Sequence, residues 1–210
     1  MKERGMIFNA EMVRAILDGR KTQTRRVLAT YQDAVKFCPE WDVNGKQIFI
    51  VLGEKDHTGM NPVITAIPCP FGQPGDRVWV RETFRVHSRA TDVATLVYRA
   101  SVRNSWTEQT HRVPVAVCNK PATPEKWTPS IHMPRWASRI TLEITGVRVE
   151  RLNSITESDA EAEGVTDTGF GDLLVDGYRY LWKSIYGEES WADNPWVWVI
   201  EFKRVKGGAA

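Results

Sequence analysis

Apolar residues recur at helical spacing close to the start of the chain. Four of them share one helical face: Met12, Val13, Ile16 and Leu17. Asn9 stands where an N-cap is expected, and Gly19 stands where the C-cap is expected. The pattern predicts a short helix over residues 10–18, followed by a strand or an extended loop over residues 20–27.

Alternation of apolar and polar residues predicts strands further along the chain. The clearest runs are 46–52, 77–86, 95–100, 139–152 and 196–205. Four large apolar side chains share one face of the last run: Trp196, Trp198, Ile200 and Phe202.

Two further helices are expected toward the C-terminal end. Thr156, with Asp159 three residues on, resembles a capping box that opens a helix ended by Gly164. Apolar residues at helical spacing then predict a second helix over about residues 173–186, closed by Gly187.

Mostly antiparallel strands with two or three helices define an α+β fold, and a small β-barrel with flanking helices is the expected architecture. A chain of 210 residues fits one domain over residues 1–210. Two stretches without periodicity, about residues 28–75 and 101–130, are expected to be long insertions, the first with one hairpin.

The composition is that of a globular protein, with 42% hydrophobic and 26% charged residues. No apolar run approaches the ~20 residues that cross a bilayer, and the N-terminal residues carry no signal-peptide pattern. Cys38, Cys69 and Cys118 favour reduced thiols, and their spacing with His57 matches no zinc pattern. The sequence predicts a cytoplasmic protein with no membrane partner, no metal site and no cofactor.

Charge is distributed unevenly, although the formal net charge is only +2. Residues 1–30 carry seven basic and three acidic side chains, whereas residues 150–195 carry eleven acidic and three basic ones. A basic face opposite an acidic one favours a small anionic ligand or a defined strand over non-specific coating of a polyanion. Solvated faces without a ligand are the alternative.

The segment with the most chemistry is Gly19-Arg20-Lys21-Thr22-Gln23-Thr24-Arg25-Arg26. Lysine and arginine side chains neutralise phosphate or hold carbonyl oxygens. In an extended segment Thr22, Thr24 and Arg26 share a face. Lys21 joins them only if the turn at Gly19 directs it there. A basic turn with solvated side chains is the alternative that spacing alone favours.

This octapeptide resembles the GxKxxTxR signature of the ASCH family, whose members share a PUA-like β-barrel. The resemblance covers about residues 5–27, 72–86 and 127–205. Residues 75–82 and 131–139 are similar to a longer ASCH branch that is common in bacteriophages and prophages. The resemblance implies a domain that holds a nucleoside, a nucleotide or a short single-stranded nucleic acid.

The short bacterial ASCH proteins are amidohydrolases that remove an acetyl group from N4-acetylcytidine with a lysine, a threonine and a glutamate. The matching positions are Lys21, Thr24 and Glu163. Arg26 would bind the substrate, and Glu161 is the alternative to Glu163. Thr24 Oγ1 would attack the amide carbonyl while Lys21, with its pKa lowered by burial, takes the proton. The glutamate would pass a proton to the leaving amine or orient Lys21.

Other polar and aromatic residues are candidates for substrate binding. They are Trp79, Arg81, Glu82, His132, Arg135 and Trp136. Trp136 would stack on a base, and Arg135 would meet a phosphate. Glu82 would need a partner if it faced the interior, because an unpaired buried carboxylate is costly, so a salt bridge to an arginine is its alternative role.

Three other functions compete with hydrolysis. A non-catalytic RNA or single-stranded DNA binding module needs only a basic, aromatic-lined groove, whereas an enzyme needs Lys21, Thr24 and a carboxylate within hydrogen-bond reach. A ribonuclease would need a base and an acid at a phosphate, and His132 and Lys21 are the candidates. A phage structural or assembly factor would have an exposed apolar patch and form stable oligomers.

Overall fold

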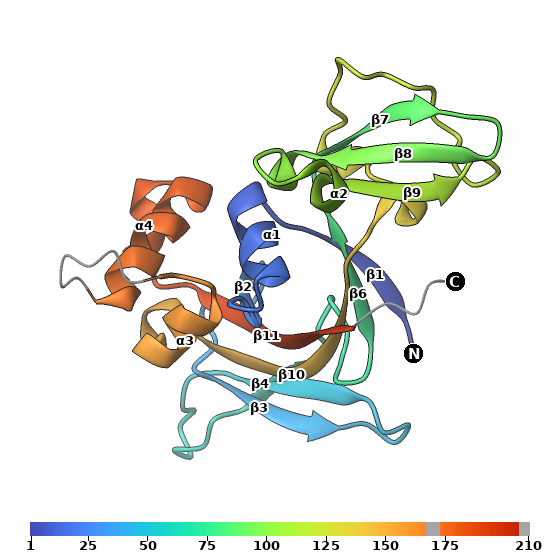
Figure 1. The fold of residues 1–210 in the computed structure, drawn as a ribbon. Coiled ribbons are helices and arrows are strands. Elements are labelled where there is room, and N and C mark those ends of the chain that lie inside the picture. Colours follow the sequence, from blue (N-terminus) through green and yellow to red (C-terminus); the bar gives the residue numbers. More distant parts are fainter. Residues whose placement is uncertain (167–172, 206–210) are drawn as a thin grey trace. The chain divides into compact units, whose positions relative to one another are not determined.

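The computed structural model describes residues 1–166 and 173–205, which form two compact units. Each unit combines segments that are distant in the sequence. Unit 1 combines Met1–Gly19 with Arg77–Glu143, and unit 2 combines Arg20–Asp76 with Ile144–Lys203. Figure 1 labels helices and strands of both units. In the described part of the chain, no helix is both long and apolar enough to cross a bilayer.

The N-terminal helix of unit 1 follows the predicted pattern. Helix α1 spans Ala10–Leu17, and the side chain of Asn9 accepts a hydrogen bond from Met12 N–H at 2.8 Å. Val13 is buried on the apolar face, and Gly19 follows the helix with a φ of +79°. A residue with a Cβ atom would be strained at that φ, which is why glycine ends this helix.

A parallel strand pair in unit 1 depends on a glycine. Strand β1 (Glu3–Ile7) pairs in parallel with β6 (Arg77–Arg81), and Gly5 lies opposite Trp79. A Cβ atom on Gly5 would lie 2.6 Å from a Trp79 ring carbon, so glycine gives the indole room to cover β1. The first residues of β10 (Thr141–Arg151) pair antiparallel to β6.

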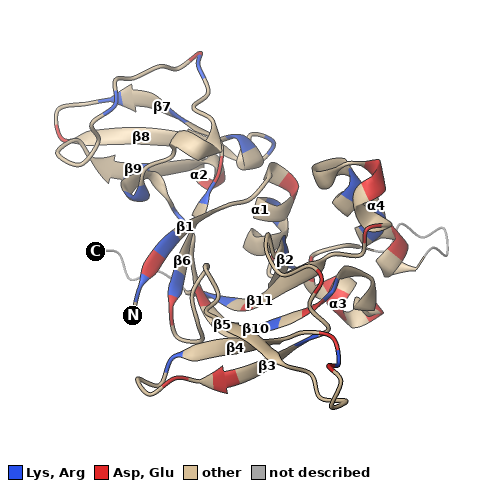
Figure 2. Cartoon of the chain, turned by 180° about the vertical axis from the view of Figure 1, so that it is seen from behind, with Lys and Arg blue, Asp and Glu red and all other residues tan. Residues whose placement is uncertain are grey.

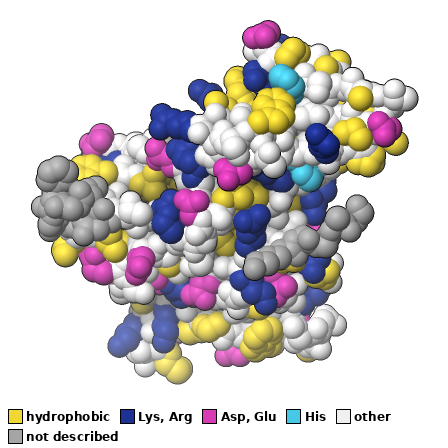
Figure 3. Space-filling model, in the orientation of Figure 1, with side chains coloured by type: hydrophobic (Ala, Val, Ile, Leu, Met, Phe, Trp, Pro, Cys, Tyr) yellow, Lys and Arg dark blue, Asp and Glu magenta, His cyan; other side chains and the backbone are white. Residues whose placement is uncertain are grey.

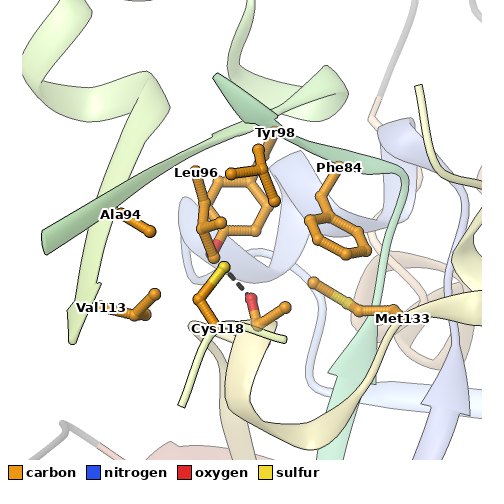
Figure 4. Packing of buried hydrophobic residues seen from close by; sticks show 9 residues of the cluster. Phe84, Ala94, Leu96, Tyr98, Val113, Cys118 and Met133 are labelled. Atoms are coloured by element: carbon orange, nitrogen blue, oxygen red, sulfur yellow. Dashed lines mark hydrogen bonds between the residues drawn. The ribbon is translucent and has the colours of Figure 1, made fainter. Parts of the chain in front are cut away.

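The second sheet of unit 1 carries a buried apolar cluster. Strands β7 (Phe84–Arg89), β8 (Val93–Tyr98) and β9 (Thr110–Pro114) form this antiparallel sheet in sequence order. The buried side chains shown in Figure 4 include Phe84, Leu96, Tyr98, Val113, Cys118 and Met133. The Tyr98 hydroxyl donates to the carbonyl of Ala137 at 2.7 Å, so this buried phenol has a hydrogen-bond partner.

Strand β11 (Trp196–Val205) lies between β10 and β2 (Gln23–Val27) in a sheet of unit 2. One face of β11 packs against two helices, α3 (Glu157–Ala162) and α4 (Leu174–Tyr186). The buried cluster there contains Ala160, Tyr178, Trp182, Val197 and Val199. The sheet and these two helices position the candidate site.

The other face of β11 packs against a second sheet of unit 2. The ring centroids of Trp198 and Phe49 are 5.1 Å apart, and those of Trp196 and Phe37 are 5.0 Å apart. Trp196 and Trp198 therefore share a face, as the period-two pattern predicts.

This second sheet is a correction to the sequence prediction of a long connection with one hairpin. It contains β3 (Lys36–Trp41), β4 (Gln47–Leu52) and β5 (Val63–Ile67), with β4 in the middle. The outer strands are edge strands with mostly exposed side chains, and Pro39 is tolerated at such an edge. Only β4 has a neighbouring strand on both sides. This is why β4 alone showed a sequence pattern that predicts a strand.

The strand predicted over residues 77–86 is also corrected, because it is two strands in different sheets. Strand β6 ends at Arg81 and β7 begins at Phe84, so the chain changes sheet at Glu82 and Thr83. Alternating burial continues across the change of sheet. The sequence pattern therefore showed no break.

The two C-terminal helices agree with their predicted caps. Thr156 and Asp159 form the predicted capping box of α3, with side chain to backbone hydrogen bonds in both directions. Gly164 follows α3 with a φ of +90°, and Gly187 ends α4 with a φ of +97°. The irregular stretch 101–130 differs from its prediction, since it holds helix α2 (Trp106–Gln109) and strand β9.

The remaining helices are short. Helix α2 spans Trp106–Gln109, and 3-10 turns span Arg99–Ser101, Ser130–His132, Arg135–Ala137, Leu152–Ser154 and Glu188–Trp191. Strands in mostly antiparallel sheets with separate helices confirm the α+β class. Among the described residues, none of the sheets closes into a barrel.

Candidate functional site

Lys21 and Glu163 form a buried ion pair in unit 2. Lys21 Nζ lies 2.6 Å from Glu163 Oε2 and also donates to the backbone carbonyl of Glu163 at 2.9 Å. Both residues are only 2% exposed. The backbone holds the pair in place, because Thr22 N–H donates to the carbonyl of Ala162 at 2.8 Å and so ties the segment before β2 to the end of α3.

The alternation of β2 divides the basic signature between two faces. Gln23 contacts Asp159, and Arg25 contacts Glu163, which also pairs with Lys21. Thr24 lies between Gln23 and Arg25 in the strand, so its side chain points to the opposite face. The structure thus brings Lys21 and Glu163 together, and among the described contacts Thr24 makes no hydrogen bond to either of them.

Arg25 connects Glu163 to two other carboxylates. Its guanidinium lies 3.3 Å from Glu163 Oε1, 2.5 Å from Glu150 Oε1 and 3.3 Å from Asp159 Oδ2. The side chain of Arg25 is fully buried, and its guanidinium carbon lies 5.8 Å from the centre of the Tyr178 ring. A planar guanidinium with five N–H donors suits this position better than an ammonium.

Arg148 forms the outer part of the same network. It lies 3.0 Å from Glu150 Oε2 and 2.7 Å from Asp159 Oδ1, and it also contacts Glu201. The contacts to Glu150 and Asp159 place Arg148 and Arg25 on the same two carboxylates. Figure 2 colours the chain by charge and shows acidic positions on α3 and basic positions on β10 and β11.

Burial determines the electrostatics of the inner pair. Desolvation lowers the pKa of Lys21, and the carboxylate of Glu163 opposes that shift by favouring the ammonium. Desolvation also raises the pKa of Tyr178, and the nearby Glu163 adds to this effect. A lysine with a lowered pKa next to a carboxylate can exchange a proton with it, which is a property of general acid–base sites and also of structural ion networks.

Asp159 gives the network a testable pH dependence. Burial disfavours its charge, but hydrogen bonds from Thr156 and the charge of Arg25 outweigh burial and lower its pKa from 3.8 to about 2. A carboxylate with a lowered folded-state pKa stabilises the protein above its ordinary pKa, and this stabilisation is lost as the pH falls through the lowered value.

We expect Asp159→Asn to lower the free energy of unfolding at pH 7 by about 1–2 kcal/mol. This is less than the full pKa shift would give, because Asp159 is partly exposed and solvent screens its interactions. Urea titrations from pH 7 to pH 2 should show this difference shrinking toward zero. Asp176→Asn is the control, because the Asp176 side chain is 48% exposed and its ion pair with Arg179 is long, at 3.8 Å. A difference in stability that does not change with pH would contradict the lowered pKa assigned to Asp159.

The predicted aromatic residues of unit 1 cover its core. Trp79 and Trp136 are partly buried and pack against the apolar cluster of the β7-β8-β9 sheet. The Arg81 guanidinium lies over the Trp79 ring, 5.5 Å from its centre, and the Trp136 ring meets Phe84 edge-on at 6.3 Å. One face of the Trp79 indole is therefore occupied by Arg81.

Glu82 is buried and paired, as its burial requires. It is 2% exposed and accepts two hydrogen bonds from Arg139. Arg139 Nε donates to Oε1 at 2.9 Å, and Arg139 Nη2 donates to Oε2 at 3.0 Å. Arg139 Nη2 also donates to Ser101 Oγ at 2.9 Å, and its guanidinium lies 4.0 Å from the centre of the Tyr98 ring. Desolvation raises the pKa of Glu82, and the hydrogen bonds from Arg139 oppose that rise.

The last two predicted residues of unit 1 lie at its surface. His132 is exposed in a 3-10 turn. Arg135 Nε lies 3.0 Å from Glu3 Oε2, and the two side chains are 45% and 39% exposed. Lys21 belongs to unit 2, so the two residues considered for a ribonuclease lie in different units.

Arg25, Glu150 and Arg148 were not predicted as site residues, and Asp159 was predicted only as part of a helix cap. One signal was available, because Lys21, Gln23 and Arg25 have the same parity in an extended segment. The signature drew attention to Thr24 and Arg26 instead. No sequence signal placed Glu150 or Arg148, because their contacts depend on how β10 meets β2 and α3.

Arg26 is half-buried on the strand face of Thr24. In the part of the chain that the structure describes, no group of three or more His, Cys, Asp or Glu residues is placed to hold a metal ion. Cys38, Cys69 and Cys118 are free thiols.

Two solved structures resemble this chain. One is an ASCH domain from Lactobacillus crispatus JV V101, with 13% identity and a TM-score of 0.40 over 97% of this chain and 79% of the other. The other is a protein from Enterococcus faecalis V583 assigned to family DUF984, with 12% identity and a TM-score of 0.40 over 100% of this chain and 86% of the other. No family model and no curated protein matches the sequence.

Proposed function

We propose that this chain is an ASCH-type protein that binds a cytidine-type nucleoside, free or within a strand, and hydrolyses an acyl amide on its exocyclic N4. The Lys21–Glu163 pair carries the proposal. Its 2.6 Å contact joins two ionisable groups that the ASCH resemblance assigns to this reaction. Nearly complete burial lowers the pKa of Lys21 toward the range in which an amine exchanges protons.

The ammonium of Lys21 has a hydrogen-bond donor left for a substrate. Two of its three N–H groups are used by the carboxylate and the carbonyl of Glu163. Within the described residues, no acceptor is found for the third. An acyl oxygen or the leaving nitrogen would accept this bond, and the low local dielectric would strengthen it.

The proposed reaction breaks the bond between the acyl carbon and N4 of the base. A nucleophile adds to the acyl carbonyl, Lys21 donates its proton to the leaving nitrogen, and Glu163 takes the proton of the nucleophile. These proton roles are the reverse of those expected from the resemblance, because Lys21 Nζ is the donor and Glu163 the acceptor of their hydrogen bond. Water supplies the remaining oxygen, so the products are a carboxylate and a free amino base.

The nucleophile is either Thr24 or water. The resemblance gives Thr24 a catalytic role, whereas its place in β2 directs it away from the face of Gln23 and Arg25. Thr24→Ala distinguishes the two cases, with Thr22→Ala as the control because Thr22 is exposed two residues away. A loss of about a thousandfold or more would assign the attack to Thr24, and retention of about a tenth or more would assign it to water.

The experiment is hydrolysis of N4-acetylcytidine by the full chain, followed by chromatography of cytidine. We expect turnover by the wild type, and a loss of about a hundredfold or more in Glu163→Gln and in Lys21→Met. Glu161→Gln is the matched control, since Glu161 is exposed on the same helix two residues before Glu163. No turnover by folded wild-type protein, or equal loss in Glu161→Gln, would overturn the proposal.

A non-catalytic binding module is the second candidate, and one observation favours it. Glu163 is already paired with both Lys21 and Arg25, as in a structural ion network. The face drawn in Figure 3 carries basic and acidic side chains interspersed with hydrophobic ones. A binding module predicts no turnover, together with saturable binding of single-stranded RNA or DNA that weakens as salt is raised.

A further inference from the structure

The β7-β8-β9 sheet of unit 1 has one face that its apolar cluster does not use. Val86 and Val113 belong to the cluster. Arg85 and Arg112 precede them on β7 and β9, so their side chains point to the opposite face. Thr95 of β8 pairs with Arg112 and shares that face. Arg85, Thr95 and Arg112 therefore define the outer face of this sheet.

Two tryptophans outside the apolar cluster lie at this outer face. The Arg85 guanidinium lies 4.7 Å from the centre of the Trp127 ring, which places Trp127 on the side of Arg85. Thr110 has the same parity as Arg112 on β9, and its hydroxyl donates to the carbonyl of Trp106 at 2.9 Å. This bond brings α2 to the outer face, and Figure 1 shows α2 beside the sheet.

The indole of Trp106 is both oriented and accessible. Its ring centroid lies 4.9 Å from that of His87, with 71° between the two planes, so the rings meet edge to face. Trp106 is nevertheless 51% exposed. An indole that is already held by a neighbouring ring loses little conformational freedom when a flat ligand stacks on it.

The outer face also carries positive charge that has no acidic partner. Residues 84–127 contain seven basic and three acidic side chains. Within the residues that the structure describes, neither Arg85 nor Arg112 forms an ion pair. Arg135 and Arg139 of the same unit, in contrast, are paired with carboxylates. Unpaired guanidinium groups beside indoles suit a ligand that combines anionic groups with flat rings.

We propose that the outer face of the β7-β8-β9 sheet binds a single strand of nucleic acid. One base stacks on Trp106, a second lies against the Arg85–Trp127 pair, and a phosphate lies at Arg112. The proposal goes beyond the proposed hydrolysis, because this surface lies in unit 1 and uses none of the residues assigned to that reaction.

The combination of rings and charges selects this ligand. A single strand presents a flat base and a phosphate at each nucleotide, and open bases stack on aromatic side chains and on guanidinium planes. A duplex offers phosphates but keeps its bases stacked inside. An acidic peptide supplies charge without regularly spaced flat rings.

Fluorescence anisotropy with labelled strands of about ten nucleotides tests the proposal on the full chain. We expect oligouridine or oligothymidine to bind about tenfold or more tightly than a duplex of the same length. Binding should weaken as the salt concentration is raised. Equal binding of the duplex or of a polyglutamate peptide, or no binding by folded wild-type protein up to ~100 μM, would overturn the proposal.

Two exposed side chains test the location. Trp106→Ala should weaken binding of the strand about tenfold by removing a stacking surface. Trp41→Ala is the matched control, because Trp41 is 62% exposed on β3 of unit 2, and it should change binding by about twofold at most. A loss in Trp106→Ala no larger than the loss in Trp41→Ala would refute this location.

The charge is tested in the same way. Arg112→Gln should weaken binding about threefold or more and make it less dependent on salt, because one phosphate contact is lost. Arg179→Gln, an exposed arginine on α4 of unit 2, should leave both quantities unchanged. Equal effects of the two substitutions would contradict a phosphate contact at Arg112.

Two further titrations identify the strand and separate the two proposals. Tighter binding of oligouridine than of oligothymidine would assign the face to RNA, and the reverse order would assign it to DNA. Glu163→Gln should bind the strand as the wild type does while losing hydrolysis. Failure of one proposal is therefore distinguishable from failure of the other.

Discussion

Replacing Arg25 with methionine is expected to lower the free energy of unfolding by about 3–5 kcal/mol, the cost of removing one partner from a buried ion pair. The guanidinium is fully buried and contacts Glu163, Glu150 and Asp159. Methionine fills part of the volume and makes none of these contacts. The remaining carboxylates would then repel one another with only Lys21 and Arg148 nearby.

Urea unfolding at pH 7 measures this loss, and Arg20→Met is the matched control. Arg20 is exposed and donates to the carbonyl of Gly164 at 3.0 Å, so its replacement should cost about 1 kcal/mol or less. A second readout is the pKa of Asp159, which should rise from about 2 in Arg25→Met, because the charge of Arg25 is one of the causes that lower it. Equal losses in both variants would contradict the role given to Arg25.

Replacing Arg139 with methionine should destabilise unit 1 by a similar amount, about 3–5 kcal/mol. Glu82 would keep its burial and lose its two hydrogen bonds of 2.9 and 3.0 Å. Burial raises the pKa of Glu82, so the folded state binds its proton more tightly than the unfolded state. The loss in Arg139→Met should therefore shrink as the pH falls, since the neutral acid is less costly to bury.

Two comparisons test the Arg139 prediction. Adding Glu82→Gln to Arg139→Met should recover part of the stability at pH 7, because it removes the unpaired charge. Arg135→Met is the control, since its pair with Glu3 has the same chemistry but is 45% and 39% exposed, and should cost about 1 kcal/mol or less. No recovery in the double variant would show that the loss comes from packing of Arg139 on Tyr98 instead of from charge.

The choice between Glu161 and Glu163 shows what the helical period predicts and what it does not. Asp159 and Glu163 are four residues apart and lie on one side of α3, and both contact Arg25. Glu161 lies between them and is exposed. A 3.6-residue period therefore separates the two glutamates once the helix is assigned. It does not identify Lys21 as the partner, because that contact spans 142 residues of sequence.

Several features were determined by the sequence alone, because they depend on neighbouring residues. Asn9 caps α1, Thr156 and Asp159 form a capping box, and the closing glycines adopt positive φ angles. Alternation likewise predicted strand β4 and the last strand, β11. Each of these depends on backbone conformation and side-chain spacing within a few residues, which the order of amino acids specifies directly.

Only the tertiary structure decided which charged groups meet. The contacts of Lys21 and Arg25 with Glu163, and the fork of Arg139 on Glu82, join residues that are 142, 138 and 57 positions apart. The change of sheet at Glu82 also left the alternating pattern intact, so no local signal marked it. Buried charges need partners, but the partner is selected by how strands and helices pack, and packing brings together residues that no local pattern relates.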